Sequence, residues 1–216
     1  MKRTIVLLSG GIDSTTALYL AKQHSDEIYS LTMIYSDTYD AEAEASKRIA
    51  AAAHVKEHLP ILLPFFKDIE LRYHAPTSPH ITTAYIPARN IIFYGIAAAY
   101  AETLQAGTIV FGSNAEDANV LPDASADFVQ LMRQLIRRGT RAGTEGFEIE
   151  IVNPLIHKTK REVLKLALEL RVPLELTWSC HNNEKTPCGK CRGCVDRHNA
   201  FNQIGMEDPL DTVKLA

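Results

Sequence analysis

The sequence predicts an α/β fold, in which a doubly wound parallel sheet is followed by a small C-terminal knuckle of cysteines. Three observations predict this fold. Short apolar runs alternate with helical patterns along the chain, and such alternation places parallel strands between two layers of helices. A glycine-rich turn joins the first apolar run to the first helical pattern, and all four cysteines lie between residues 180 and 194.

Each expected element follows from a local pattern. The apolar runs predict strands at residues 4–8, 28–35, 57–62, 108–112 and 148–152. The helical patterns predict helices at residues 14–24, 41–53, 88–106, 126–138 and 159–171. Thr159 and Glu162 form the capping-box pattern that marks the start of the last helix. Residues 64–87 are rich in proline and are expected to form one long irregular loop, which we interpret as an active-site lid.

Composition limits the class of protein. A chain of 216 residues that is 46% hydrophobic can bury one substantial core. We expect residues 1–175 to form the α/β domain and residues 176–216 the cysteine segment. The sequence has no 18-residue apolar stretch, and Met1-Lys2-Arg3 leads into a strand that is too short for a signal peptide. We therefore expect a cytoplasmic protein without a membrane partner.

The charge pattern disfavours direct binding of nucleic acid. The net charge of −3 is spread along the chain without a basic block, whereas neutralising phosphates normally needs a basic surface. One predicted helix and its end carry a group of arginines, which we interpret as a solvated face: Arg133, Arg137, Arg138 and Arg141.

The glycine-rich turn predicts a phosphate site. Gly10 and Gly11 allow the backbone to bring its N–H groups close to an anion, at the positive end of the following helix. Asp13 would repel phosphate unless a divalent cation lay between them, so the pattern indicates ATP bound with Mg²⁺. The residues expected to bind ATP are Leu8, Ser9, Gly10, Gly11, Ile12, Asp13, Ser14, Thr15 and Thr16.

The turn has no lysine of the Walker type. It resembles instead the PP-loop of the N-type ATP pyrophosphatases, which have an adenine nucleotide alpha hydrolase-like fold. That resemblance implies release of pyrophosphate with AMP left on the substrate. Ligands of parallel α/β sheets bind at the carboxyl ends of the strands. Tyr35, Ser36 and Asp37 follow the second strand and should lie near the adenosine.

The cysteines predict a metal site. Cys180, Cys188, Cys191 and Cys194 have the spacing Cys-x7-Cys-x2-Cys-x2-Cys, which suits one tetrahedral thiolate centre. We favour structural Zn²⁺, because four thiolates leave no position for water or substrate. An iron–sulfur cluster is the alternative. Disulfides, or a redox role for Cys188 and Cys191, are disfavoured in a cytosolic chain.

Further motifs extend the resemblance over nearly the whole chain. They are Ile86-Pro87-Ala88-Arg89-Asn90 at a helix start, Pro154-Leu155 followed by Lys160 and Glu162, and the cysteine set ending in Arg197. In this order, together with the PP-loop, they are similar to the 7-cyano-7-deazaguanine (preQ0) synthase family. Two segments depart from the family pattern: Ser36 to Tyr39, and Val120 to Ser125.

The resemblance implies a reaction. ATP adenylates 7-carboxy-7-deazaguanine, ammonia displaces AMP to give an amide, and a second ATP-driven step dehydrates the amide to the nitrile. Asp13, Lys160 and Arg89 are then expected to be catalytic, since a lysine or arginine at a helix start opposes the helix dipole unless an anion binds there. Asp117, Pro122 and Asp123 are expected to bind the deazaguanine. The resemblance also implies a homodimer.

Other functions stay open at this point. A diverged relative could stop at the amide or couple the activated deazaguanine to another amine, such as one on a protein. A tRNA-thiolating PP-loop enzyme is disfavoured, because the chain lacks a basic surface and the knuckle uses every cysteine. A non-enzymatic nucleotide-binding module with a zinc knuckle is disfavoured because Ser9, Asp13 and Ser14 are all present.

Overall fold

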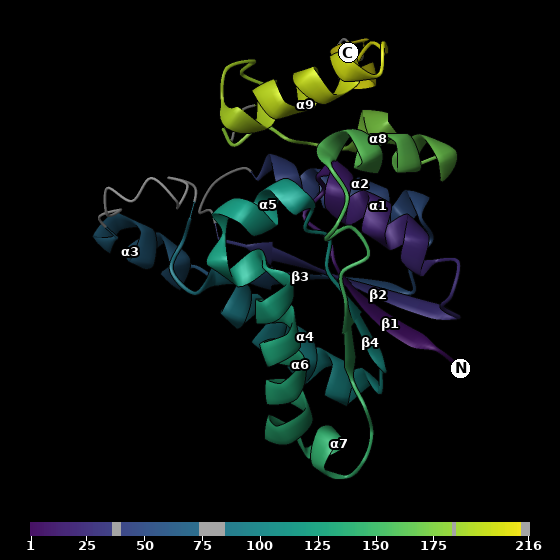
Figure 1. Cartoon of the computed structure of the whole chain (residues 1–216), viewed down its shortest axis with the longest axis vertical. Coiled ribbons are helices and arrows are strands. Elements are labelled where there is room, and N and C mark those ends of the chain that lie inside the picture. The colour runs from purple at the N-terminus through teal and green to yellow at the C-terminus, as the bar shows by residue number, and fades with distance from the viewer. Residues whose placement is uncertain (36–39, 74–84, 183–184, 213–216) are drawn as a thin grey trace.

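A computed structural model describes residues 1–35, 40–73, 85–182 and 185–212. Five parallel strands form one sheet in the order β3-β2-β1-β4-β5 (Figure 1). Their bounds are β1 Arg3–Leu7, β2 Glu27–Ile34, β3 Glu57–Leu62, β4 Thr108–Val110 and β5 Glu150–Val152. The order reverses between β1 and β4, as in doubly wound sheets, and so confirms the predicted fold class. Within the described residues, no helix is both long and apolar enough to cross a lipid bilayer.

Helices cover both faces of the sheet because the strands alternate their side chains. Val6 and Ile28 point into one core cluster, whereas Ile5 and Tyr29 point into another. The first cluster packs against α1 Ile12–Ala21, α2 Ala41–Ala52, α8 Lys160–Glu169 and α9 Arg192–Gln203. The second cluster packs against α4 Arg89–Leu104 and α6 Ala126–Gly139. In Figure 1 these two groups of helices lie on opposite sides of the strands.

Shorter helices connect these layers. They are α3 Phe65–Arg72, α5 Ala115–Val120, α7 Arg141–Thr144 and α10 Pro209–Thr212, with 3-10 turns at Pro122–Ala124 and Leu174–Leu176. The ten predicted strands and helices are confirmed, each to within three residues at either end. The helix α9 was not predicted.

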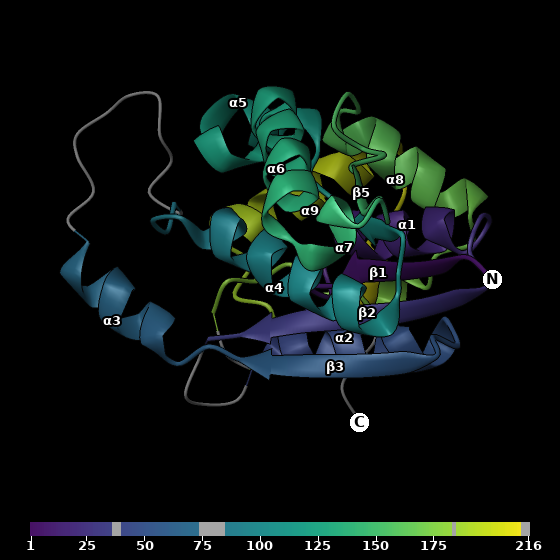
Figure 2. The same cartoon turned by 90° about the horizontal axis from the view of Figure 1, so that it is seen from below.

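The predicted irregular loop at residues 64–87 is partly wrong. Residues Phe65–Arg72 form α3, which lies at the margin of the molecule beside the end of β3 (Figure 2). Phe66 is 1% exposed and anchors this helix in a small apolar cluster, and Asp68 pairs with Arg72 one turn later. That anchoring is a tertiary contact, which local patterns do not reveal. Residues 74–84, the central part of the predicted lid, lie outside the described residues.

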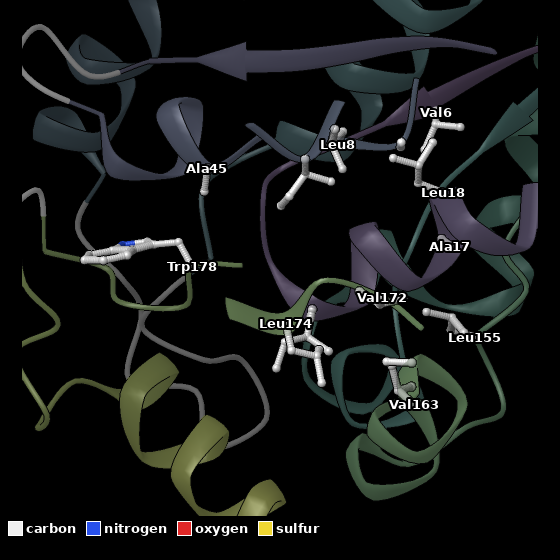
Figure 3. Packing of buried hydrophobic residues seen from close by; sticks show 14 of the residues in the cluster. Val6, Leu8, Ala17, Leu18, Ala45, Leu155, Val163, Val172, Leu174 and Trp178 are labelled. Atoms are coloured by element: carbon white, nitrogen blue, oxygen red, sulfur yellow. The ribbon is translucent and has the colours of Figure 1, made fainter. Parts of the chain in front are cut away.

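The C-terminal segment shares the first core cluster with the rest of the chain. Trp178, Cys180 and Phe201 are buried in it together with Leu8 and Leu164. Figure 3 shows Trp178 and Leu174 among the side chains of this cluster, with Trp178 near Ala45. The core is therefore continuous across residue 175.

The buried ion pair of Arg197 with Asp208 links α9 to this core. The Arg197 guanidinium donates to Asp208 at 2.5 and 2.8 Å, and to the Thr177 hydroxyl at 2.7 Å. It also donates to the Leu174 carbonyl at 3.1 Å. Because all five guanidinium donors need partners when buried, this network sets the position of α9 relative to residues 174–178.

One member of the predicted arginine face is not solvated. Arg133 of α6 donates to the Ile151 carbonyl of the edge strand β5. Arg141 begins α7 and pairs with Glu145 at the surface.

Candidate active site and metal centre

A cavity of about 890 Å³ opens at the carboxyl ends of β1, β2 and β4, where α/β sheets bind ligands. Its volume is in the range of small-molecule sites. The PP-loop lines it, together with Met33 near the end of β2 and Tyr35 directly after that strand. Gly112 and Asn114 after β4, Lys160 at the start of α8, and one face of α9 complete the lining.

The PP-loop presents hydrogen-bond donors without a capping partner to this cavity. Gly11 is the N-cap of α1, and no described side chain caps the helix, so its first N–H groups are available to an anion. The Ser14 hydroxyl lies 3.0 Å from the Ser9 hydroxyl and accepts from the Ser9 N–H at 3.2 Å. Ser9, Gly11, Ile12, Asp13 and Ser14 line the cavity together with Leu8 and Tyr35.

Three predicted ATP residues do not line the cavity. The hydroxyls of Thr15 and Thr16 donate to the carbonyls of Gly11 and Ile12, each at 2.7 Å, so they stabilise the first turn of α1. Gly10 faces α2, with a φ of +84°. The contribution of these three residues to ATP binding stays a prediction. In the structure they stabilise the conformation of the PP-loop and the first turn of α1.

Gly10→Ala should destabilise the protein by about 3 kcal/mol, from the left-handed backbone and from overpacking. A Cβ at this position would stand 2.7 Å from the Glu42 carbonyl oxygen and 2.9 Å from the Ser46 nitrogen. Gly146→Ala is the matched control, because Gly146 has a φ of +86° and open space around it; it should cost about 1 kcal/mol. Urea unfolding measures both values, and equal losses would contradict the close packing of Gly10 against α2.

Asp13 and Lys160 form an ion pair at the centre of the site. The same Asp13 oxygen, Oδ2, accepts from Asn114 Nδ2 at 3.1 Å. Burial of the Lys160 ammonium lowers its pKa, but Asp13, Asp117 and Glu116 more than offset this, and the pKa lies above its ordinary value. The other oxygen, Asp13 Oδ1, is buried without a hydrogen-bond partner among the described residues. An acceptor left in this state suits coordination of a divalent cation.

The start of α8 is held as the sequence predicts. Thr159 accepts from the Glu162 N–H and donates its own N–H to Glu162 Oε2 at 2.8 Å, which confirms the capping box. The Lys160 N–H donates to both Glu116 oxygens, at 3.1 and 3.0 Å. These bonds leave the Lys160 side chain directed at Asp13.

Arg89 is the other predicted catalytic cation, and it lines the cavity at the start of α4. Its guanidinium acts on Tyr35 through a hydrogen bond and on Glu42 through its charge. Burial raises the pKa of the Tyr35 hydroxyl, and the Arg89 charge opposes that rise. The Tyr35 ring packs 5.8 Å from Phe66 and 6.4 Å from Phe93, between ring centroids. Ser36 and Asp37, predicted beside it, lie outside the described residues.

The three predicted deazaguanine residues are not brought together at the cavity. Asp117 lines it, and burial together with the neighbouring Asp13 raises its pKa. Pro122 and Asp123 are not part of the described lining. The buried Asp123 carboxylate accepts from the Asn90 N–H at 3.1 Å, and Asn90 Nδ2 donates to the Asp123 carbonyl at 3.0 Å. Asp123 thus holds the start of α4, which carries Arg89, and its contact with substrate stays a prediction.

The four cysteines converge as predicted. Their sulfurs lie within 4.8 Å of one another, and none is in a disulfide. Cys180 and Cys191 Sγ are 3.9 Å apart, close to the roughly 3.8 Å expected between two thiolates of a tetrahedral zinc site. The Cys188 N–H donates to Cys180 Sγ at 3.3 Å and the Cys191 N–H donates to Cys188 Sγ at 3.3 Å. Backbone donors of this kind stabilise thiolates, so the cluster fits a metal.

Glycine in this segment is required by close packing. A Cβ on Gly193 would stand 1.8 Å from the Ser179 carbonyl oxygen. Gly193 therefore lets α9 begin directly against the segment that carries Cys180.

Comparison with known proteins identifies the family. A family model described as "Queuosine biosynthesis protein QueC" matches residues 3–205. The chain belongs to the QueC family. A relative from Trichodesmium erythraeum (strain IMS101), named 7-cyano-7-deazaguanine synthase, is 38% identical over 96% of this chain and 99% of the relative. A relative of the same name from Acetivibrio thermocellus is 35% identical over 98% of both chains.

Solved structures share the fold of this QueC-family chain. An NH3-dependent NAD synthetase from Campylobacter jejuni matches with a TM-score of 0.51 and 21% identity, over 81% of this chain and 66% of that one. A 4-thiouridine synthetase in complex with RNA and ATP matches with a TM-score of 0.54 and 19% identity, over 94% of this chain and 50% of that one. The chain therefore spans about two thirds of the NAD synthetase and half of the 4-thiouridine synthetase. These similarities show a shared fold.

Sequence reasoning missed one wall of the QueC-family site. Four residues of α9 line the cavity: Arg192, Asp196, Asn199 and Gln203. Their spacing of four, three and four residues places them on one helix face. Apolar residues at 200, 201 and 204 give the matching buried face, so the periodic signal for this helix was present beside the cysteines.

Proposed function

We propose that this chain is a 7-cyano-7-deazaguanine synthase, which converts 7-carboxy-7-deazaguanine, ammonia and ATP into the nitrile base used in queuosine biosynthesis. The observation that carries this proposal is the match to the QueC family over residues 3–205, with relatives of that name aligned over nearly their full length. The PP-loop and the cavity above it supply the nucleotide chemistry that such a reaction needs.

Adenylation gives the substrate a leaving group, because a carboxylate by itself is a poor electrophile. The carboxylate oxygen attacks the α-phosphorus of ATP, and pyrophosphate leaves. The first N–H groups of α1 and the hydroxyls of Ser9 and Ser14 are placed to hold the phosphates. No protein nucleophile is required, so the contribution of the chain is positioning and neutralisation of charge.

We propose that Mg²⁺ enters with ATP and that Asp13 coordinates it. The ion would neutralise the charge of the departing pyrophosphate. The buried, unpartnered Asp13 Oδ1 supports this assignment. Lys160, which pairs with the other Asp13 oxygen, and Arg89 both line the cavity and would supply positive charge for the phosphate oxygens.

We assign Zn²⁺ to the four cysteines. The sulfur spacing and the backbone N–H donors support one closed tetrahedral centre, whose role is to hold the start of α9 and hence one cavity wall. A homodimer and a cytoplasmic location stay predictions, each open to direct measurement by light scattering and by cell fractionation.

Incubation with 7-carboxy-7-deazaguanine, nitrogen-15 ammonium and excess ATP should yield the labelled nitrile with two AMP for each product. Mass spectrometry of the base, with quantification of AMP, measures both. An accumulating labelled amide, or a deazaguanine adduct on a protein amine, would select the diverged relative instead. Binding of ATP without turnover would select the non-enzymatic module.

A further inference from the structure

We propose that Glu42 is a catalytic base of this reaction, which accepts the protons that the nitrogen atom loses on its way from ammonium to nitrile. This inference rests on the proposed function and adds a residue to it. Glu42 lines the cavity one residue beyond the start of α2, and its backbone carbonyl packs against Gly10 of the PP-loop.

The chemistry requires such a group. Ammonium has no free electron pair, so it must give up a proton before its nitrogen can attack the acyl adenylate. The C–N bond then forms, the C–O bond to AMP breaks, and the nitrogen loses one more proton to become an amide. In the second half, the amide oxygen displaces pyrophosphate from ATP. The same nitrogen then loses its last two protons as AMP leaves and the C≡N bond forms.

The packing places Glu42 firmly at the site. Its carbonyl oxygen is so close to Gly10 of the PP-loop that a Cβ there would stand only 2.7 Å away. Asp40 caps the helix by accepting from the Ala43 N–H at 2.9 Å, which fixes the first turn that carries Glu42. These two contacts fix the backbone of Glu42 beside the loop that binds phosphates. Glu42 and Arg89 both line the cavity, and the Arg89 charge acts on the Glu42 carboxylate.

The surroundings of this carboxylate suit proton transfer. Burial, followed by the charge of Asp40, raises the pKa of Glu42 to about 7, and Arg89 opposes the rise. The other ionisable group that faces it is Tyr35, at the end of β2. A base works best when its pKa lies near the working pH, because it is then both ionised and able to hold the proton.

Every other acid in the described lining is already engaged or solvated. Asp13 is paired with Lys160, and Glu116 accepts from the Lys160 N–H. Asp117 belongs to the capping box of α5, and Asp196 lies 3.3 Å from the Arg192 guanidinium. Asp40 is the helix cap, and Glu70 is exposed to solvent. For the Glu42 carboxylate, burial and the charges of Asp40 and Arg89 are the influences found among the described residues, and none of these is a hydrogen bond.

The first test separates activation from amination in Glu42→Gln. ATP–pyrophosphate exchange with 7-carboxy-7-deazaguanine, without ammonium, reports adenylation; nitrile formation with ammonium reports the steps that lose protons. The ratio of the nitrile rate to the exchange rate should fall about 10²-fold or more, the usual contribution of a general base. Glu44→Gln is the matched control, because Glu44 lies in the same helix turn but is exposed to solvent, and it should leave the ratio unchanged.

The second test uses a nucleophile that is uncharged at neutral pH. Hydroxylamine needs no proton removed before it attacks, so Glu42→Gln should form the hydroxamate at nearly the wild-type ratio to exchange. The wild-type enzyme at saturating ammonium should also lose activity below about pH 7, where the Glu42 carboxyl with its raised pKa takes up a proton, and the variant should lack this inflection. Glu42→Asp, which keeps a carboxylate, should recover part of the ammonium-dependent rate.

The outcomes are distinct. Three results in Glu42→Gln would each overturn the role of Glu42 as a base. They are equal losses of the exchange rate and the nitrile rate, an unchanged nitrile rate with ammonium, and an unchanged pH inflection. Absence of exchange in the wild-type enzyme would instead overturn the proposed function. Thermal unfolding at pH 8 completes the set. The Glu42→Gln substitution removes a partly buried charge and should not lower the melting temperature. A lowered melting temperature would indicate a merely structural role for Glu42.

Discussion

Alanine in place of Asp13 is expected to lower the rate of AMP and pyrophosphate formation by about 10²–10³-fold, the usual cost of losing one preorganised electrostatic contact. Two consequences combine. The proposed ligand of Mg²⁺ is lost, and the Lys160 ammonium loses its ion-pair partner. Because the two partners of Asp13, Lys160 and Asn114, line the cavity, the fold should persist.

Asp127→Ala is the matched control for this experiment. Asp127 is also an acid in the first turn of a helix, but it is exposed on α6 and is not among the residues that line the cavity. Its activity should equal that of the wild type, while circular dichroism should be the same for both variants. ADP and phosphate as primary products of the wild-type enzyme would contradict the PP-loop assignment itself.

Serine in place of Cys191 should remove the metal and destabilise the C-terminal segment. A structural zinc site contributes its binding free energy to folding. Loss of roughly 3 kcal/mol of it would lower the melting temperature by about 6–12 °C for a chain of this size. Cys191 is also the N-cap of α9, so the cavity wall formed by that helix should loosen, and proteolysis should cut first between Cys180 and Phe201.

Lys190→Ala controls for a change within the same turn. Lys190 is exposed between two of the cysteines, and its side chain is absent from the thiolate cluster. It should keep one zinc per chain by elemental analysis and the wild-type melting temperature. A Cys191→Ser protein that retained zinc and wild-type stability would refute the four-thiolate centre, and iron in the purified wild-type protein would favour the cluster alternative.

Local sequence patterns determined much of this molecule. The alternation of apolar runs and helical periods placed ten elements and the parallel sheet, because both periodicities arise within a few residues. The PP-loop, the capping box of Thr159 with Glu162, and the cysteine spacing are likewise local, and each was found where predicted. The family resemblance followed from those motifs.

Tertiary structure decided which of these residues share the site. The ion pair of Asp13 with Lys160 joins residues that are 147 positions apart, and the buried Asp123 contacts the start of α4 rather than the cavity. Glu42 and the face of α9 enter the lining only because the PP-loop packs on α2 and the Arg197 network fixes α9. Such contacts depend on the burial of surfaces from distant segments, and no pattern along a single segment contains that information.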